Sequence, residues 1–349
     1  MNAPFAGGSD LSVLPNPYLL FLGDTQERGF AKTALGLRDW AADKCVGELR
    51  LTDATVSTGL PAMTPAQARA LGAQAMVIGV ANQGGIIPLA WRASLVEALE
   101  AGLDLIAGMH MRLADLPEVA ATAQRLGRTL YDVRVPPADI PVATGRKRSG
   151  KRLLTVGTDC ALGKKYTALA LARAFATRGV PTDFRATGQT GIMIAGHGIP
   201  MDAVVSDFEA GAAEILSPDA APDHWDVIEG QGSLAHPAYA AVSLGLLHGS
   251  QPDVFVVCHE PGRREMLGTA GYGVVSVEEI ASLAIALGRR TNPAIRCGGY
   301  SYNTAALDAD AADALMAAES ARLGLPVADP IRGGAAFDAL VENCLKETA

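Results

Sequence analysis

The chain has 349 residues, a length that favours two domains. Its 49% hydrophobic share allows well-buried cores, and its 5% aromatic share indicates α/β layers packed by alanine, valine and leucine. A formal charge of −8 argues against general binding to nucleic acid or anionic membranes. Five scattered cysteines form no CxxC pair, which argues against a disulfide framework and a structural zinc site.

The N-terminus has no basic segment followed by an apolar core, and no apolar run reaches about 18 residues. We therefore expect a cytoplasmic protein.

The first half of the chain alternates strand and helix patterns. Strands are expected at 18–22, 75–80, 103–107 and 129–133, with helices at 30–42, 90–101 and 116–126. Such alternation predicts a parallel sheet with right-handed crossovers. The sequence therefore predicts a Rossmann-like domain over residues 1–140. Because this region lacks GxGxxG, dinucleotide binding there has no support.

Ligands of such sheets bind beyond the carboxyl ends of the strands. The polar candidates at this edge are Asp24, Arg28, Lys32, Asn82, His110 and Arg112. Each alone could be a solvated loop residue or a local cap. Together, several cations at one sheet edge could hold a dicarboxylate.

Residues 141–152 form a predicted basic linker that includes the run Arg146 to Arg152. We interpret this run as a solvated hinge, although it could also lend charge to a phosphate-rich ligand. Strand and helix patterns then resume and predict a second parallel domain over 153–349. Its strands are expected at 153–156, 182–186, 226–229, 254–258, 294–297 and 326–328, and its helices at 166–176, 208–215, 277–287, 306–322 and 335–346.

The second domain opens with the stretch GTDCALGKKYT, residues 157–167, between a predicted strand and a predicted helix. Its glycines let main-chain amides turn inward, the helix N-terminus adds partial positive charge, and Lys164 can reach a phosphate. The stretch therefore predicts a phosphate-binding loop rather than a plain βα turn. The residues expected to bind a cofactor are Gly157, Thr158, Asp159, Cys160, Gly163, Lys164, Lys165 and Tyr166.

Two details distinguish this loop from the common GxxxxGK[ST] pattern. Five residues separate Gly157 from Gly163, and Lys165 stands where a Ser or Thr would hold Mg²⁺. Thr167 lies most of a helical turn further on and is a poor substitute. A second cation in place of a metal ligand favours binding of phosphates without a metal and without hydrolysis. Cys160 could carry an acyl group, although a small packed residue is the more ordinary role.

Three further segments follow predicted strands and carry polar side chains. The first contains Thr187, Gln189 and Thr190; the second Glu229, Gln231, Ser233 and His236; the third His259, Glu260, Arg263 and Arg264. Hydroxyl and amide groups among glycines suit the recognition of anions. Each segment alone could be turn chemistry, but three at the strand ends of one sheet predict a single pocket.

With these segments the sequence resembles a bacterial family long described only as proteins of unknown function. The resemblance covers nearly the whole chain, through GTDCALGKK, ATGQTG, EGQGSLAHPAY and CHEPGR. It implies a Rossmann-like N-terminal domain, a P-loop-type C-terminal domain and the activity of D-glutamate N-acetyltransferase. A more distant similarity to dethiobiotin synthetase implies ATP and magnesium, and Lys165 departs from that pattern.

The leading hypothesis is transfer of an acetyl group from acetyl-CoA to the amine of D-glutamate or a similar acidic amino acid, with no metal required. Such a reaction needs a base, an oxyanion donor and groups that hold the carboxylates. Glu229, His236 and His259 are the candidate bases, and Glu229 is favoured because its small neighbours leave room for a substrate. The substrate-binding candidates are Arg263, Arg264, Lys32, Asn82, Thr187, Gln189, Thr190, Gln231 and Ser233.

Two alternatives stay open. One is an ATP- and magnesium-dependent ligase or carboxylase, with Asp159 and Glu229 as metal ligands. The other is a non-catalytic module that senses a nucleotide or metabolite. In each case we expect a homo-oligomer without nucleic-acid or membrane partners.

Overall fold

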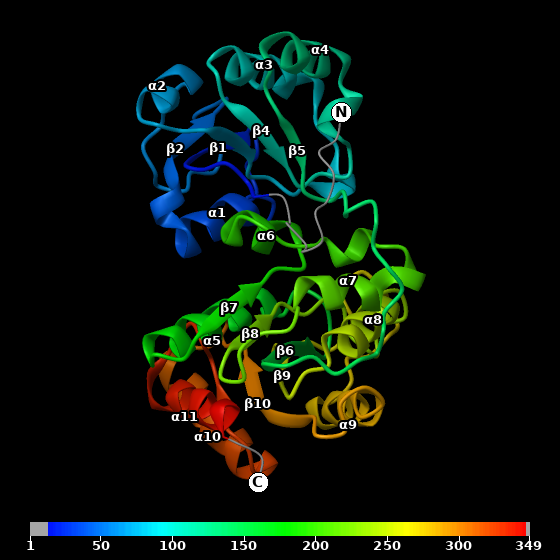
Figure 1. The fold of residues 1–349 in the computed structure, drawn as a ribbon. Coiled ribbons are helices and arrows are strands. Elements are labelled where there is room, and N and C mark those ends of the chain that lie inside the picture. The colour runs from blue at the N-terminus through cyan, green and yellow to red at the C-terminus, as the bar shows by residue number, and fades with distance from the viewer. Residues whose placement is uncertain (1–12, 347–349) are drawn as a thin grey trace. The chain divides into compact units, whose positions relative to one another are not determined.

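A computed structural model describes residues 13–346 of the chain, which divide into two compact units (Figure 1). Unit 1 comprises the described residues up to 136 together with 188–203, and unit 2 comprises 137–187 together with 204–346. The sequence-based boundaries assign 188–203 to the second domain, whereas in the structure this stretch packs within unit 1. The chain therefore leaves unit 2 after Thr187 and returns to it at Val204.

Unit 1 is built on a five-stranded, all-parallel sheet of order β2-β1-β3-β4-β5. Its strands are β1 (Tyr18–Gly23), β2 (Cys45–Arg50), β3 (Ala75–Ile78), β4 (Asp104–Ala107) and β5 (Leu130–Asp132). Its helices are α1 (Lys32–Trp40), α2 (Pro65–Ala70), α3 (Arg92–Glu100), α4 (Pro117–Leu126) and α6 (Gln189–Ala195). The four strands predicted for this half are all present.

The sequence missed β2, α2 and α6 in unit 1. Strand β2 is an edge strand with only its two central residues buried, so it lacks the continuous apolar run of the other strands. Helix α2 has six residues, too few to show a helical period.

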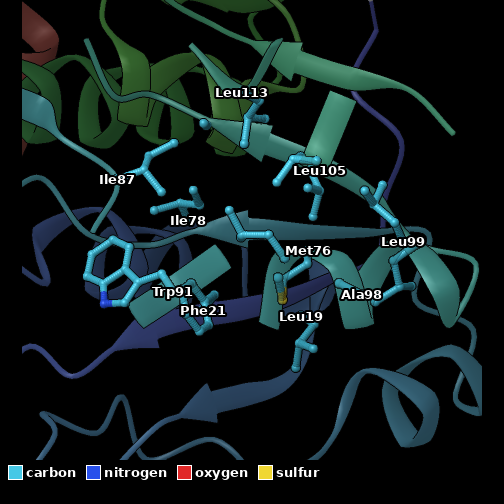
Figure 2. Close-up of a cluster of buried hydrophobic side chains, with 14 of the residues drawn as sticks. Leu19, Phe21, Met76, Ile78, Ile87, Trp91, Ala98, Leu99, Leu105 and Leu113 are labelled. Carbon is cyan, nitrogen blue, oxygen red and sulfur yellow. The ribbon is translucent and has the colours of Figure 1, made fainter. Parts of the chain in front are cut away.

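A core of unit 1 lies between the sheet and helices α2, α3 and α4. Figure 2 shows Leu19 and Phe21 of β1 and Met76 and Ile78 of β3 beside Trp91 and Leu99. The rings of Phe21 and Trp91 meet edge to face at 5.5 Å. Burying each such side chain contributes roughly 1.5–3 kcal/mol, so this cluster accounts for much of the stability of the unit.

Unit 2 is built on a six-stranded, all-parallel sheet of order β11-β10-β9-β6-β8-β7. Its strands are β6 (Lys151–Gly157), β7 (Thr182–Arg185), β8 (Trp225–Ile228), β9 (Val254–His259), β10 (Arg296–Tyr302) and β11 (Val327–Ala328). Its helices are α5 (Lys164–Thr177), α7 (Glu209–Leu216), α8 (Ala240–Ser250), α9 (Val277–Gly288), α10 (Ala309–Leu323) and α11 (Gly334–Leu345). The predicted α/β class with two parallel sheets is confirmed.

Helix α8 was missed because it contains two glycines, which lower helix propensity. In the structure these glycines allow close packing against α7. A Cβ on Gly249 would lie 2.2 Å from the carbonyl oxygen of Ala210, and one on Gly245 would lie 2.3 Å from the carboxylate of Glu209.

The interpretation of the basic run as a solvated hinge is wrong for two of its arginines. Arg152 is fully buried on β6 and donates to Ser217 Oγ at 2.7 Å and to the Pro218 carbonyl at 2.8 Å. Arg148 is also buried and donates to the Gly249 carbonyl near the end of α8. Because both lie toward the amino end of β6, they are remote from the loop at its carboxyl end.

Across residues 13–346, no helix combines the length and the apolar character that crossing a bilayer requires.

Candidate active site

The predicted phosphate loop connects Gly157, the last residue of β6, to Lys164, the first residue of α5. Gly163 has φ of +114°, which favours glycine, and Ala161 has φ of +53° although it carries a side chain. Within residues 13–346, the main-chain N–H groups of Ala161, Leu162 and Gly163 donate to no acceptor. These amides at the start of a helix are suitable donors for an anion.

The two loop lysines lie in different surroundings. Lys164 is buried, and its Nζ donates to the carbonyl of Asp159 at 2.7 Å. Burial lowers the pKa of Lys164. Lys165 places its Nζ 4.5 Å from the centre of the Tyr166 ring. Thr167, the poor substitute for a metal ligand, has its hydroxyl 2.7 Å from that of Ser301 and is buried.

Strand β6 lies between β8 and β9, so the segments after these three strands meet at one sheet edge. After β9, Arg263 bonds Asp159 Oδ2 at 2.8 Å and the Cys160 carbonyl at 2.7 Å. Arg263 is therefore committed to the phosphate loop, which differs from the carboxylate-binding role that the sequence suggests. Arg264 is exposed.

Cys160 is a poor candidate for carrying an acyl group. Burial raises the pKa of its thiol, which disfavours the nucleophilic thiolate. This favours the packed role over the acyl-carrying one.

Glu229 directly follows β8 and is buried. Its Oε2 accepts the N–H of Thr187 at 3.0 Å, and the Thr187 hydroxyl donates to the Glu229 carbonyl at 2.6 Å. Gln231 Nε2 in turn donates to the Thr187 hydroxyl at 2.9 Å. Ser233, two residues further along the chain, is buried. The Thr187 N–H thereby orients the Glu229 carboxylate, and Gln231 holds the Thr187 hydroxyl that bonds the Glu229 main chain.

The neighbouring Gly230 must be a glycine. A Cβ there would lie 1.6 Å from the carbonyl oxygen of Thr155 on β6. Its N–H also donates to the Thr155 hydroxyl at 2.9 Å, which fixes the chain after β8 against β6.

The two candidate histidines differ in the availability of their ring nitrogens. In His236, Nδ1 accepts the N–H of Ala238 at 3.1 Å and Nε2 lies 3.4 Å from the Leu267 carbonyl. Both nitrogens are engaged, which suits an orienting role better than that of a base. His259 has Nδ1 2.9 Å from the Thr158 hydroxyl, and its ring meets the edge of Tyr302. Burial lowers the pKa of His259 and favours its neutral form.

Four predicted site residues lie in unit 1. Gln189 and Thr190 begin α6, where the Thr190 hydroxyl is 3.0 Å from that of Thr33 on α1. Lys32 is exposed at the start of α1, and Asn82 donates to the Ile86 carbonyl at 2.9 Å.

The predicted segment 186–191 is therefore divided between the units after Thr187. The apolar run 192–195 followed by Gly196 is a helix signal, and it could have predicted helix α6 from the sequence. Sequence reasoning also missed Thr155 and the pairing of Arg263 with Asp159, because neither has a local pattern.

A Rossmann-like sheet together with a second parallel sheet that bears a lysine-containing phosphate loop defines a two-domain α/β protein of the P-loop type. The N-terminal model of one family, described as a Rossmann-like domain of unknown function, matches residues 43–136. Its C-terminal counterpart, described as a P-loop domain of unknown function, matches residues 141–341. The chain belongs to this family, DUF1611, and the resemblance predicted from the sequence is confirmed.

Two curated relatives are similar over nearly their whole length. A protein of Tritonibacter scottomollicae named D-glutamate N-acetyltransferase is 50% identical over 93% of this chain and 97% of its own. A protein of the same name from Pseudoalteromonas sp. is 45% identical over 94% of this chain and 98% of its own. A crystal structure of a DUF1611 protein from Anabaena variabilis is 34% identical and superposes with a TM-score of 0.83, over 95% of this chain and 100% of that one.

Proposed function

We propose that this chain is an acyltransferase that moves an acetyl group from acetyl-CoA to the amine of D-glutamate. The observation that carries the proposal is the 50% identity, across 93% of the chain, to a protein named D-glutamate N-acetyltransferase. The phosphate loop supports it, because CoA carries phosphates that need binding without hydrolysis. We further propose that the protein acts in the cytoplasm as a homo-oligomer.

The loop is the proposed site for the phosphates of the acetyl donor. The amides of Ala161, Leu162 and Gly163, which have no acceptor within residues 13–346, supply donors, and the cations Lys164 and Lys165 supply positive charge. In this proposal a second lysine, rather than a magnesium ion, balances the phosphate charge. Binding of the donor therefore requires no metal.

The chemistry requires the ammonium group of the acceptor to lose a proton before its nitrogen attacks the thioester carbonyl carbon. The C–N bond forms, the C–S bond breaks, and CoA leaves as a thiolate that takes up a proton. We propose Glu229 as the base, because the Thr187 N–H orients its carboxylate and the Thr187 hydroxyl, itself held by Gln231, bonds its main chain. His259 is the alternative base. Amides of the 230–233 segment are the proposed oxyanion donors.

The two carboxylates of the acceptor need cations as partners. Since Arg263 already bonds Asp159 and Glu260, we propose that an exposed cation serves this purpose, either Arg264 of unit 2 or Lys32 of unit 1. Asn82, Gln189, Thr190 and Ser233 stay as proposed polar contacts with the substrate.

The test is to incubate the purified protein with acetyl-CoA and a panel of D- and L-amino acids. Release of free thiol and the mass of the product are measured, with and without EDTA. We expect N-acetyl-D-glutamate as the main product and no effect of EDTA. Parallel reactions with ATP test the ligase alternative, and ATP cleavage that depends on D-glutamate and Mg²⁺ would contradict the proposal.

A further inference from the structure

The ion pair between Asp159, a residue of the phosphate loop, and Arg263 has no part in the chemistry above. The Asp159 side chain is fully buried. Its carboxylate accepts the N–H groups of Cys160 at 2.6 Å and Leu267 at 2.8 Å, besides Arg263 at 2.8 Å. Burial would raise the pKa of Asp159, but these bonds, led by that from Arg263, outweigh burial and lower the pKa. The carboxylate is therefore charged.

The same guanidinium also bonds the main chain of the loop. Arg263 Nη1 donates to the Cys160 carbonyl at 2.7 Å, and Nη2 donates to the Glu260 carboxylate at 2.5 Å. In a trans peptide the C=O and the N–H point in opposite directions. By holding the Cys160 carbonyl, Arg263 therefore turns the N–H of Ala161 away from itself and leaves it available to a ligand.

Lys164 holds the preceding carbonyl, that of Asp159, in the same manner. Two successive carbonyls are thus bonded by cations, while the next three amides stay without an acceptor in the described chain. The left-handed conformation of Ala161 costs about 1–2 kcal/mol. Such a conformation persists only where surrounding bonds oppose that cost, as those from Arg263 and Lys164 do.

We infer that Arg263 is a positioning residue for the acetyl donor. The pairing of Arg263 with Asp159 fixes the phosphate loop in its binding conformation before the ligand arrives. This inference rests on the proposed function and deepens it. Arg263 acts on the loop through Asp159 and Cys160, so its loss weakens binding of the donor phosphates. It leaves the KM for D-glutamate unchanged.

The experiment measures the Kd of CoA and of inorganic pyrophosphate by calorimetry, and the KM of both substrates. The variants are Arg263→Gln, Arg263→Lys, Asp159→Asn and the double Asp159→Asn/Arg263→Gln. Arg290→Gln, at an exposed arginine on the same unit, is the matched control. Melting temperatures identify any variant that fails to fold, and Arg263→Lys, which keeps the charge but lacks the forked geometry, is the milder substitute.

We expect Arg263→Gln and Asp159→Asn each to weaken binding of both probes by about 10- to 100-fold, with the KM for D-glutamate within about twofold of the parent. The double variant should bind the two probes no more weakly than the single variant with the larger loss of affinity, because the two residues act as one unit. Arg263→Lys should resemble Arg263→Gln, and Arg290→Gln should resemble the parent.

Two results would overturn the inference. One is unchanged binding of both probes in Arg263→Gln, and the other is a raised KM for D-glutamate with normal CoA affinity, which would assign Arg263 to the acceptor. A different binding pattern is expected if the proposed function is wrong. The parent would then bind pyrophosphate but not CoA, and loss of pyrophosphate binding in Arg263→Gln would still support the role of the pair in the loop.

Discussion

The two sheets have the same all-parallel construction, yet their carboxyl edges are used differently. In unit 1, glycines at this edge make room for side chains. A Cβ on Gly23 would meet the Trp91 ring at 2.3 Å, one on Gly79 would meet Ala34 at 2.5 Å, and one on Gly108 would meet Gln189 at 2.0 Å. In unit 2, Gly230 instead makes room for the main chain of β6.

The difference teaches that a parallel sheet edge provides a place for a site without creating one. At the unit 1 positions just described, packed side chains fill the edge, and Asp24 is bonded to Trp91 Nε1 at 2.8 Å. The unit 2 edge instead holds a buried lysine, an oriented glutamate and loop amides that have no acceptor among the described residues. The predictions below test whether function follows that difference.

The largest expected effect concerns the glutamate. Glu229→Gln is nearly isosteric and should lower kcat by about 10²–10⁴, the usual contribution of a general base, with little change in acetyl-CoA affinity. Asp24→Asn, its counterpart at the edge of unit 1, should lower the melting temperature slightly and leave kcat near that of the parent. Steady-state kinetics measure both. Near-parent kcat in Glu229→Gln with a collapse in His259→Asn would assign the base to the histidine.

The next effect concerns the buried lysine. Lys164→Ala should weaken acetyl-CoA binding by about 1.5–3 kcal/mol, because a charge-assisted contact with phosphate is lost. Lys44, whose Nζ bonds the Ile194 carbonyl at 2.8 Å in unit 1, provides the control. Lys44→Ala should leave the Kd unchanged. Calorimetry with and without EDTA gives the values, and a strict Mg²⁺ requirement would contradict the metal-free loop.

The acceptor carboxylates should matter to a similar or smaller extent. Replacing D-glutamate with D-glutamine removes one carboxylate and leaves a cation unmatched. The resulting drop in kcat/KM should correspond to a free-energy loss of roughly 1–3 kcal/mol. Comparing Lys32→Ala with Arg264→Ala shows which unit supplies that cation. The responsible variant should lose the preference for glutamate over glutamine. Equal activity of the parent on both substrates would remove the argument for paired carboxylates.

The smallest expected effect concerns the second loop lysine. Lys165→Thr restores the hydroxyl of the common pattern but should not produce an efficient ATPase. It should weaken CoA binding by about 0.5–1.5 kcal/mol, since one cation is lost. Binding and phosphate-release assays measure these two outcomes. Affinity equal to that of the parent would show that Lys165 does not contact the ligand.

Local sequence was sufficient to predict the phosphate loop and most of the parallel strands. A buried strand, a glycine-bounded turn and the start of a helix are contiguous in the chain, and their conformations depend mainly on neighbouring residues. The sequence placed Lys164 and Lys165 directly before a helix expected from residue 166, and in the structure α5 begins at Lys164. The strand ends also placed Glu229 and His259 at one sheet edge.

Other features were decided by the tertiary structure. The position of β6 between β8 and β9 brings Arg263 to Asp159, 104 residues away in the chain. The burial of Arg152 and the packing of 188–203 in unit 1 likewise depend on segments distant in sequence. Sequence periodicity shows which face of an element is apolar, but the partner of a charged side chain depends on which strands are adjacent. That choice is made by the packing of the whole unit.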